Sequence, residues 1–150
     1  MRHLLLTFFY SGLSPKAPGT MGSLLALVLG VGIVKFLGLE TLFLSTILVT
    51  IVGIKYINIY EQEGGPHDDK SIVIDEVAGM WLTLVLSSTT WLQIGLSFLF
   101  FRLFDIWKPS IIGRIDQNVK GGLGVMGDDL LAGIFAGICS AGTFHLLTLI

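Results

Sequence analysis

The sequence predicts an all-α fold: a polytopic membrane bundle of five apolar helical segments, at least four of which span the bilayer. Two observations lead to this prediction. Of the 150 residues, 53% are hydrophobic and only 13% are charged, and the mean hydropathy of +0.82 is too high for an ordinary soluble domain. The charges also cluster between long apolar runs. A chain of this length builds one compact unit, so we expect a single integral-membrane domain over residues 1–150.

The apolar segments approach the length of a spanning helix, which needs about 20 residues. They cover residues 21–39, 41–60, 72–86, 91–107 and 128–150. The first two form a tight hairpin that turns near Gly38. A polar loop with two glycines and a proline follows at 61–71, and the stretch 109–127 is predicted to be a long glycine-rich loop.

A shorter apolar run occupies residues 4–10, directly after Arg2. It resembles the start of a signal peptide, but the small residues of a cleavage site are missing and the polar stretch 14–20 follows instead. About 10 apolar residues cannot cross a bilayer. We therefore expect the N-terminal run 4–10 to belong to the mature chain as an interfacial or re-entrant helix.

The charges fall almost entirely on one side of the predicted bundle. If the stretch 14–20 lies on one side, then the loops 61–71 and 108–127 lie there too, and the turns near Glu40 and at 87–90 lie opposite. Of the eleven acidic residues only Glu40, and of the nine basic residues only Lys35, falls on the second side. The positive-inside rule then places the charged side in the cytoplasm. This assigns the chain to a cytoplasmic membrane as a multi-pass protein.

Composition also excludes some partners and sites. The formal net charge is −2 and no large basic patch exists, which argues against nucleic acid as a partner. A single cysteine, Cys139, excludes a disulfide framework and a cysteine-rich metal site.

Five carboxylates interrupt or border the apolar segments on the charged side: Asp75, Glu76, Asp105, Asp128 and Asp129. An ionised acid at the membrane centre costs about 2.5–3.5 kcal/mol on insertion scales. Acids that converge at one end of a bundle repel one another unless a cation lies between them, and oxygen ligands suit Mg²⁺. Neighbours on a helix point about 100° apart, so one acid of each adjacent pair faces a common centre most easily. The alternative is a set of solvated loop acids and helix N-caps, and it is strongest for the 128/129 pair.

Candidate phosphate ligands lie near these acids. Arg102 and Lys108 flank Asp105, and Lys16 lies in the stretch before the first long segment. An ion pair of Arg102 with Asp105 and a lysine that reaches the membrane surface would explain the same residues without a ligand. Thr20 and Ser23 either line the site or cap the first long helix.

Glycines provide two further expectations. The run 121–127 lets a backbone approach a ligand closely, and its amides at the start of the last helix could hold an anion. Gly79 lies one turn after Asp75 and is expected to let a neighbouring helix close the site. Trp81, by contrast, is expected in an interfacial aromatic belt.

Four ordered blocks of the sequence are similar to one known family. They are residues 15–23 (PKAPGTMGS), 72–81 (IVIDEVAGMW), 101–109 (FRLFDIWKP) and 121–133 (GGLGVMGDDLLAG). Together they resemble the phosphatidylglycerophosphatase A family over most of the chain. The chain departs from the family pattern after Lys108-Pro109, where Ser110-Ile111-Ile112 replaces the more usual Trp-Pro-Ile.

The resemblance implies a Mg²⁺-dependent phosphatase that converts phosphatidylglycerophosphate to phosphatidylglycerol in the bacterial cytoplasmic membrane. We expect Asp75, Glu76, Asp105 and Asp129 to be catalytic residues, and all five acids, Asp128 included, to be metal ligands. The residues exclude phosphatases that use a Cys-based loop, an Asp-x-Asp aspartyl phosphate or a His nucleophile. This leaves metal-activated water, and a covalent phosphoenzyme formed by one of the acids stays open as the alternative. The alternative function is a small cation-binding transporter or channel, because converging intramembrane acids also describe an ion path.

Overall fold

The computed structural model describes residues 2–67, 69–87 and 90–149, and this part of the chain is helical with no strand. The elements are α1 (Arg2–Leu6), the 3₁₀ turn η1 (Ser11–Leu13), α2 (Pro18–Leu37), α3 (Leu39–Gln62), α4 (Ile74–Leu86), α5 (Trp91–Trp107), α6 (Ile111–Asn118) and α7 (Gly121–Leu149). Residue 68 of the polar loop, residues 88–89 of the predicted turn, and Ile150 lie outside the described residues. The predicted hairpin is confirmed, since α2 and α3 meet at Gly38, whose φ of 93° suits glycine.

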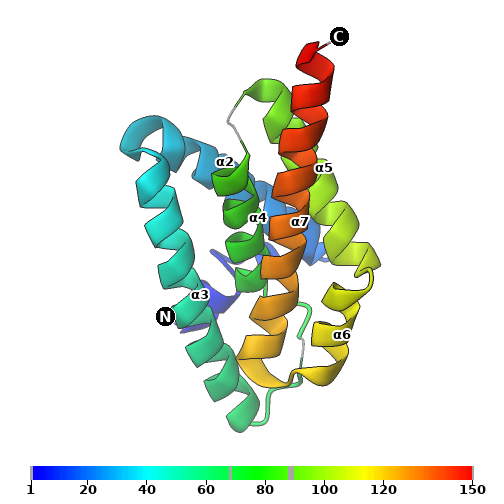
Figure 1. The fold of residues 1–150 in the computed structure, drawn as a ribbon. Helices are drawn as coiled ribbons and strands as arrows, with labels where there is room; N and C mark the ends of the chain where they lie inside the picture. The colour runs from blue at the N-terminus through cyan, green and yellow to red at the C-terminus, as the bar shows by residue number, and fades with distance from the viewer. Residues whose placement is uncertain (1, 68, 88–89, 150) are drawn as a thin grey trace.

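Helix α4 is the centre of the bundle. It packs against α2, α3, α5 and α7, and most of its residues are buried; Figure 1 shows it between α3 and α7. Trp81 of α4 is buried, and its indole Nε1 donates a hydrogen bond of 2.8 Å to the Ala26 carbonyl in α2. The expectation that Trp81 belongs to an interfacial belt is therefore wrong, because its polar atom finds a partner inside the protein.

The crossing of α4 and α7 depends on two glycines. A Cβ at Gly79 would lie 2.5 Å from the Asp129 carbonyl oxygen, and a Cβ at Gly133 would collide with the backbone of Gly79. The two backbones can therefore approach only because neither residue has a side chain. Each glycine lies four residues after an acid, Asp75 or Asp129, so the close crossing brings these acids to the same level of the bundle.

The outer surface of the bundle is apolar, as in a membrane protein. Large hydrophobic side chains such as Val28, Leu48, Ile51 and Ile138 are exposed on the long helices. Three helices, α2, α3 and α7, are long and apolar enough to cross a membrane. The expectation of at least four spanning segments is not confirmed. The 13 residues of α4 extend only about 20 Å, less than the roughly 30 Å hydrocarbon core.

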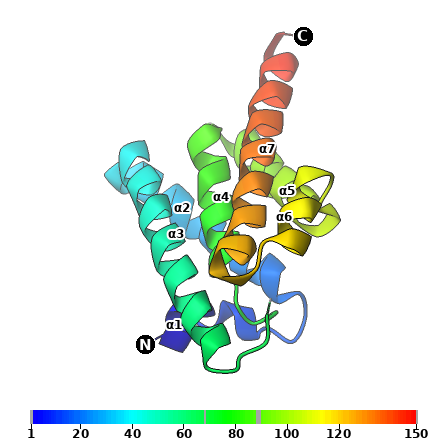
Figure 2. The same ribbon diagram turned by 60° about the horizontal axis from the view of Figure 1, so that its bottom comes forward.

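The N-terminal segment is short, as predicted. After α1 the chain turns through Phe8, Phe9 and Tyr10, which have positive φ angles. Figure 2 shows α1 beside the C-terminal end of α3. The Leu6 carbonyl accepts a 2.9 Å hydrogen bond from the amide of Val73, directly before α4. This segment therefore supports the start of the central helix.

The prediction of a long loop at 109–127 is wrong, because most of these residues are helical, in α6 and in the first turns of α7. Glycine has low helix propensity, but here packing outweighs it. A Cβ at Gly122 would lie 2.8 Å from the Ile54 Cα of α3, so the glycines let α7 pack closely. The Gly122 amide donates a 2.7 Å hydrogen bond to Asn58 Oδ1. That amide is therefore already bonded within the protein, unlike the anion-binding amides expected for the glycine run.

Candidate active site

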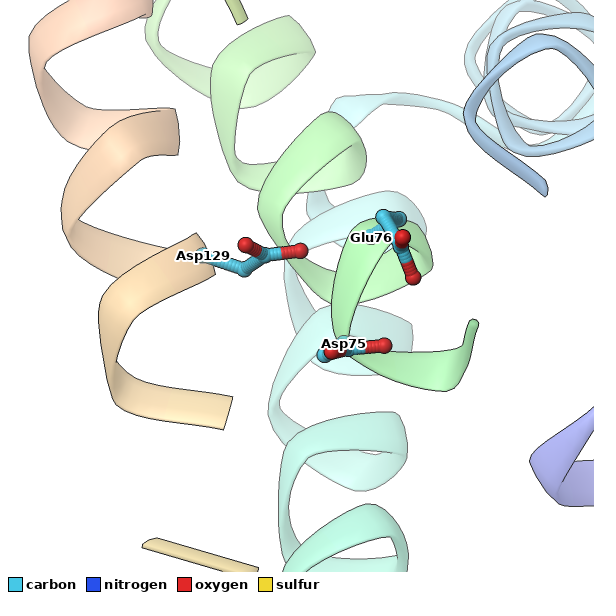
Figure 3. Close-up of side chains that lie close together, drawn as sticks. All are labelled: Asp75, Glu76 and Asp129. Atoms are coloured by element: carbon cyan, nitrogen blue, oxygen red, sulfur yellow. The ribbon is translucent and has the colours of Figure 1, made fainter. Parts of the chain in front are cut away.

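Three carboxylates meet where α4 and α7 cross. Asp75 and Glu76 lie in the first turn of α4, and Asp129 extends toward them from α7 (Figure 3). One oxygen from each acid lies within 4.8 Å of the others. Asp75 and Asp129 are buried and Glu76 is half-buried. The expectation that one acid of each pair faces the centre holds for Asp129 but not for the 75/76 pair, both members of which take part.

Each of these acids has a buried oxygen without a hydrogen-bond partner in the described part of the chain: Asp75 Oδ1, Glu76 Oε2 and Asp129 Oδ2. Buried carboxylate oxygens without a partner are costly and rare. Three carboxylates whose oxygens lie this close together form the all-oxygen donor set that a hard divalent cation prefers. The residues present therefore fit Mg²⁺.

Asp105 and Arg102 bring α5 to the same site. They form the ion pair expected from their i, i+3 spacing, and Asp105 also lies close enough to Asp129 for the two carboxylates to interact. Arg102 Nη1 donates a 3.3 Å hydrogen bond to Ser23 Oγ, and this hydroxyl donates to the Gly19 carbonyl at 2.7 Å. Ser23 is fully buried and does not line the pocket, so it contacts the guanidinium on the side away from the pocket.

Lys108 and Asp128 form a second ion pair at the end of α5. Lys108 Nζ lies 2.7 Å from Asp128 Oδ2. Lys108 caps α5 in the left-handed conformation with φ 45°, which turns the chain toward α6. Asp128 lies more than one turn inside α7, so the alternative that it caps this helix is wrong. Asp128 is also outside the group of three acids that could share an ion.

All five predicted acids, together with Arg102 and Lys108, line one pocket with a volume of about 340 Å³. Three of the predicted phosphate ligands are not among its lining residues: Lys16 is exposed before α2, Thr20 is half-buried in the first turn of α2, and Ser23 lies behind Arg102. The pocket contains residues that the sequence did not single out, namely Ala17, Pro18, Gly19, Asp69, Lys70, Ile72 and Ile106.

The sequence did not predict Asp69 as a pocket residue, because no pattern in a charged loop distinguishes the one acid that hydrogen-bonds to the folded protein. Its carboxylate accepts hydrogen bonds from the Tyr60 hydroxyl at 2.5 Å and from the backbone amide and the hydroxyl of Ser71, each at 2.9 Å. The bond from Tyr60, followed by the bond from the Ser71 amide, holds the pKa of Asp69 below its usual range. The only sequence signal was the position of this charge, three residues before the apolar segment 72–86.

Comparison with known proteins identifies the family. A model of the phosphatidylglycerophosphatase A family matches residues 4–144. The chain belongs to the phosphatidylglycerophosphatase A family. It is 43% identical over 135 residues to phosphatidylglycerophosphatase A of Escherichia coli. The aligned residues cover 89% of this chain and 78% of that protein. The corresponding protein of Haemophilus influenzae is 40% identical over 135 residues, or 89% of this chain and 83% of that protein.

A third relative, from Bacteroides thetaiotaomicron, has the name "Putative phosphatidylinositol-3-phosphatase". It is 39% identical over 146 residues, which cover 92% of this chain and 90% of that protein. No solved structure shows significant similarity to the chain. As a member of the phosphatidylglycerophosphatase A family, the chain is a phosphoric monoester hydrolase.

Proposed function

We propose that the protein removes the terminal phosphate of phosphatidylglycerophosphate, giving phosphatidylglycerol and inorganic phosphate, with Mg²⁺ as its cofactor. The observation that carries this proposal is the group formed by Asp75, Glu76 and Asp129. Each offers a carboxylate oxygen within 4.8 Å of the others, and each has a buried oxygen without a hydrogen-bond partner among the described residues. These residues would hold the ion. When bound, Mg²⁺ supplies positive charge to the phosphoryl oxygens and lowers the pKa of the attacking water.

The cationic side chains of the pocket orient the phosphate. Arg102 approaches from α5, held by Ser23 and Asp105, and Lys108 approaches from the end of the same helix, held by Asp128. Both cations therefore occupy fixed positions before substrate binds, so little ordering is required of them when it does. Lys16 and Thr20, which lie near the pocket at the start of α2, remain candidates for the outer phosphate oxygens.

Asp105 is the carboxylate that we assign as general base. It lies beside Asp129 and belongs to the pocket but not to the three-acid group. Water attacks phosphorus and gives its proton to Asp105. The bond between phosphorus and the glycerol oxygen breaks, and its electron pair goes to that oxygen, which takes up a proton from solvent water. Asp105 then releases its proton to solvent and returns to the carboxylate form.

The fold favours the phosphatase over a cation transporter. Directly beyond the acids, the bundle is filled by buried apolar side chains, among them Val77, Met80, Phe101 and Ala132. Farther along, the buried polar side chains Thr83, Ser97 and Ser140 are uncharged and hydrogen-bond to one another or to helix carbonyls. A path for ions would instead carry ionisable groups toward the opposite end. We further propose that the protein lies in the bacterial cytoplasmic membrane with its pocket facing the cytoplasm.

The decisive experiment is phosphate release from phosphatidylglycerophosphate by the purified protein in detergent. We expect turnover with Mg²⁺ and its loss in excess chelator, followed by recovery when Mg²⁺ is added back. Full turnover in chelator would overturn the metal mechanism. Absence of turnover on this lipid under all metal conditions would overturn the assigned substrate.

A further inference from the structure

Lys70 is a cation at the mouth of the pocket that the mechanism above does not use. It lines the pocket from the loop between α3 and α4, and its side chain is exposed. Within the described part of the chain, Lys70 forms no ion pair, whereas Arg102 and Lys108 are each paired with a carboxylate of the same pocket. Its charge is therefore available to a ligand.

The turn that carries Lys70 is held on both sides. The Asp69 carboxylate binds the Tyr60 hydroxyl at the end of α3, and the Asp69 carbonyl accepts a 2.8 Å hydrogen bond from the Ile72 amide. On the other side, Gly12 packs so closely on Ser71 that a Cβ there would collide with its carbonyl. A lysine on an anchored turn loses less freedom on binding than one on a free loop.

The mouth of the pocket also has an apolar border. Ile106 lines the pocket from α5 and is 71% exposed. Lys70 and Ile106 thus offer one charged and one apolar contact near the surface, while the three-acid group lies deeper. A ligand that fits this arrangement has a phosphate at its tip, a second anionic group farther out, and a hydrocarbon part beyond it.

We propose that Lys70 binds the phosphodiester of the lipid substrate and selects for lipids that carry this second anionic group. The inference rests on the proposed function, since phosphatidylglycerophosphate contains a terminal phosphomonoester and a phosphodiester next to its acyl chains. With the monoester at the three-acid group, the diester lies toward the mouth, where an ammonium group forms a charge-assisted hydrogen bond to it. Lys70 is thus a specificity-determining residue and takes no part in the bond-breaking step.

The test compares the wild-type protein with Lys70→Gln, Lys70→Arg and the control Lys120→Gln, all in uncharged detergent with Mg²⁺. Lys120 is exposed at the same end of the bundle but does not line the pocket. Two ligands separate the groups of the substrate: short-chain phosphatidylglycerol carries only the diester, and inorganic phosphate resembles only the monoester. Their binding is measured directly by titration, and KM and kcat are measured with phosphatidylglycerophosphate.

We expect Lys70→Gln to raise KM and the Kd of phosphatidylglycerol by about tenfold, the effect of losing one charged hydrogen bond of about 1.4 kcal/mol. kcat and the Kd of phosphate should stay within about twofold, Lys70→Arg should restore most of the affinity, and Lys120→Gln should match the wild type. Equal weakening of both ligands, a loss of kcat alone, or no change would each overturn the role of Lys70. A wild-type protein that binds phosphatidylglycerol through Lys70 but hydrolyses no phosphatidylglycerophosphate would overturn the proposed function, and of this inference it would leave only the binding of a lipid phosphodiester by Lys70.

Discussion

Asp128 and Asp129 are neighbours in the chain, but their carboxylates have different partners. Side chains of consecutive helical residues point about 100° apart. Asp129 therefore faces the first turn of α4 and joins Asp75 and Glu76, whereas Asp128 faces the end of α5 and holds Lys108. The geometry separates a residue suited to an ion from one suited to positioning a phosphate ligand.

Substitution of these acids should separate the two roles. Asp75→Asn and Asp129→Asn each remove a charged donor from the three-acid group, so we expect turnover to fall roughly 100-fold or more while the protein still inserts and folds. Asp128→Asn releases Lys108, so it should raise KM more than it lowers kcat. Steady-state kinetics with phosphatidylglycerophosphate measure both effects.

The control for this series is Glu40→Gln, which removes an exposed carboxylate at the opposite end of the bundle. It should leave kcat and KM unchanged. Full activity in Asp129→Asn would remove this residue from the site. Identical kinetic losses in Asp128→Asn and Asp129→Asn would contradict the division of roles.

At the scale of single residues, the sequence predicts the acids better than their surroundings. Asp75 and Asp105 stand out because a carboxylate in an apolar run is costly and therefore needs a reason. Asp69 and Lys70 do not stand out, because charges in a polar loop cost nothing. Their place in the pocket follows from hydrogen bonds to Tyr60 and Ser71, which only the folded chain brings together.

At the scale of elements, the site depends on the crossing of α4 and α7. The sequence correctly indicates that Gly79 lets a neighbouring helix approach. It does not reveal that the glycine run before Asp128 is itself helical, because low propensity favours a loop and the compensating contacts with α3 are tertiary. Helices α4 and α5 are also shorter than the roughly 20 residues of a helix that spans the bilayer alone. A short α4 is possible because other helices enclose it.

A methyl group at this crossing should separate the two helices. Gly79→Ala places a Cβ 2.5 Å from the Asp129 carbonyl oxygen, and Gly133→Ala collides with the Gly79 backbone. Backbone atoms cannot move aside cheaply, so we expect each change to destabilise the protein by about 1–3 kcal/mol. Activity should fall as well, because Asp75 and Asp129 lose their alignment. Thermal unfolding in detergent and phosphate release are the measurements.

Gly142→Ala is the matched control, because it makes the same change in α7 where a Cβ would meet nothing within 4 Å. Alanine favours helix over glycine by up to about 1 kcal/mol. This variant should therefore be as stable as the wild type or slightly more stable, with unchanged activity. Wild-type stability in both Gly79→Ala and Gly133→Ala would show that the crossing is looser than the structure indicates.

At the scale of the whole molecule, the distribution of charge predicts the arrangement of the ends. The polar loop after α3 and the start of α7 lie at one end of the bundle, while the α2–α3 turn lies toward the other (Figure 1). Residues of that polar loop line the pocket. This agrees with the assignment of loops to the two sides of the bundle from the sequence. That assignment succeeds because it needs only the order of the loops and their charges. The orientation that we propose for the bundle in the membrane rests on the positive-inside rule and is open to a direct test.

Cysteine labelling can measure this orientation. Cys139 is the single cysteine of the chain, so Cys139→Ser provides a background without thiols. On it, Glu40→Cys reports the α2–α3 turn, and Gln62→Cys reports the end of α3 beside the pocket loop; both positions are exposed. In intact spheroplasts, a membrane-impermeant maleimide should label the cysteine at 40. It should label the cysteine at 62 only after permeabilisation, because the proposed orientation places the charged end in the cytoplasm. Labelling of the cysteine at 62 in intact spheroplasts would reverse the proposed orientation and place the pocket on the outer side.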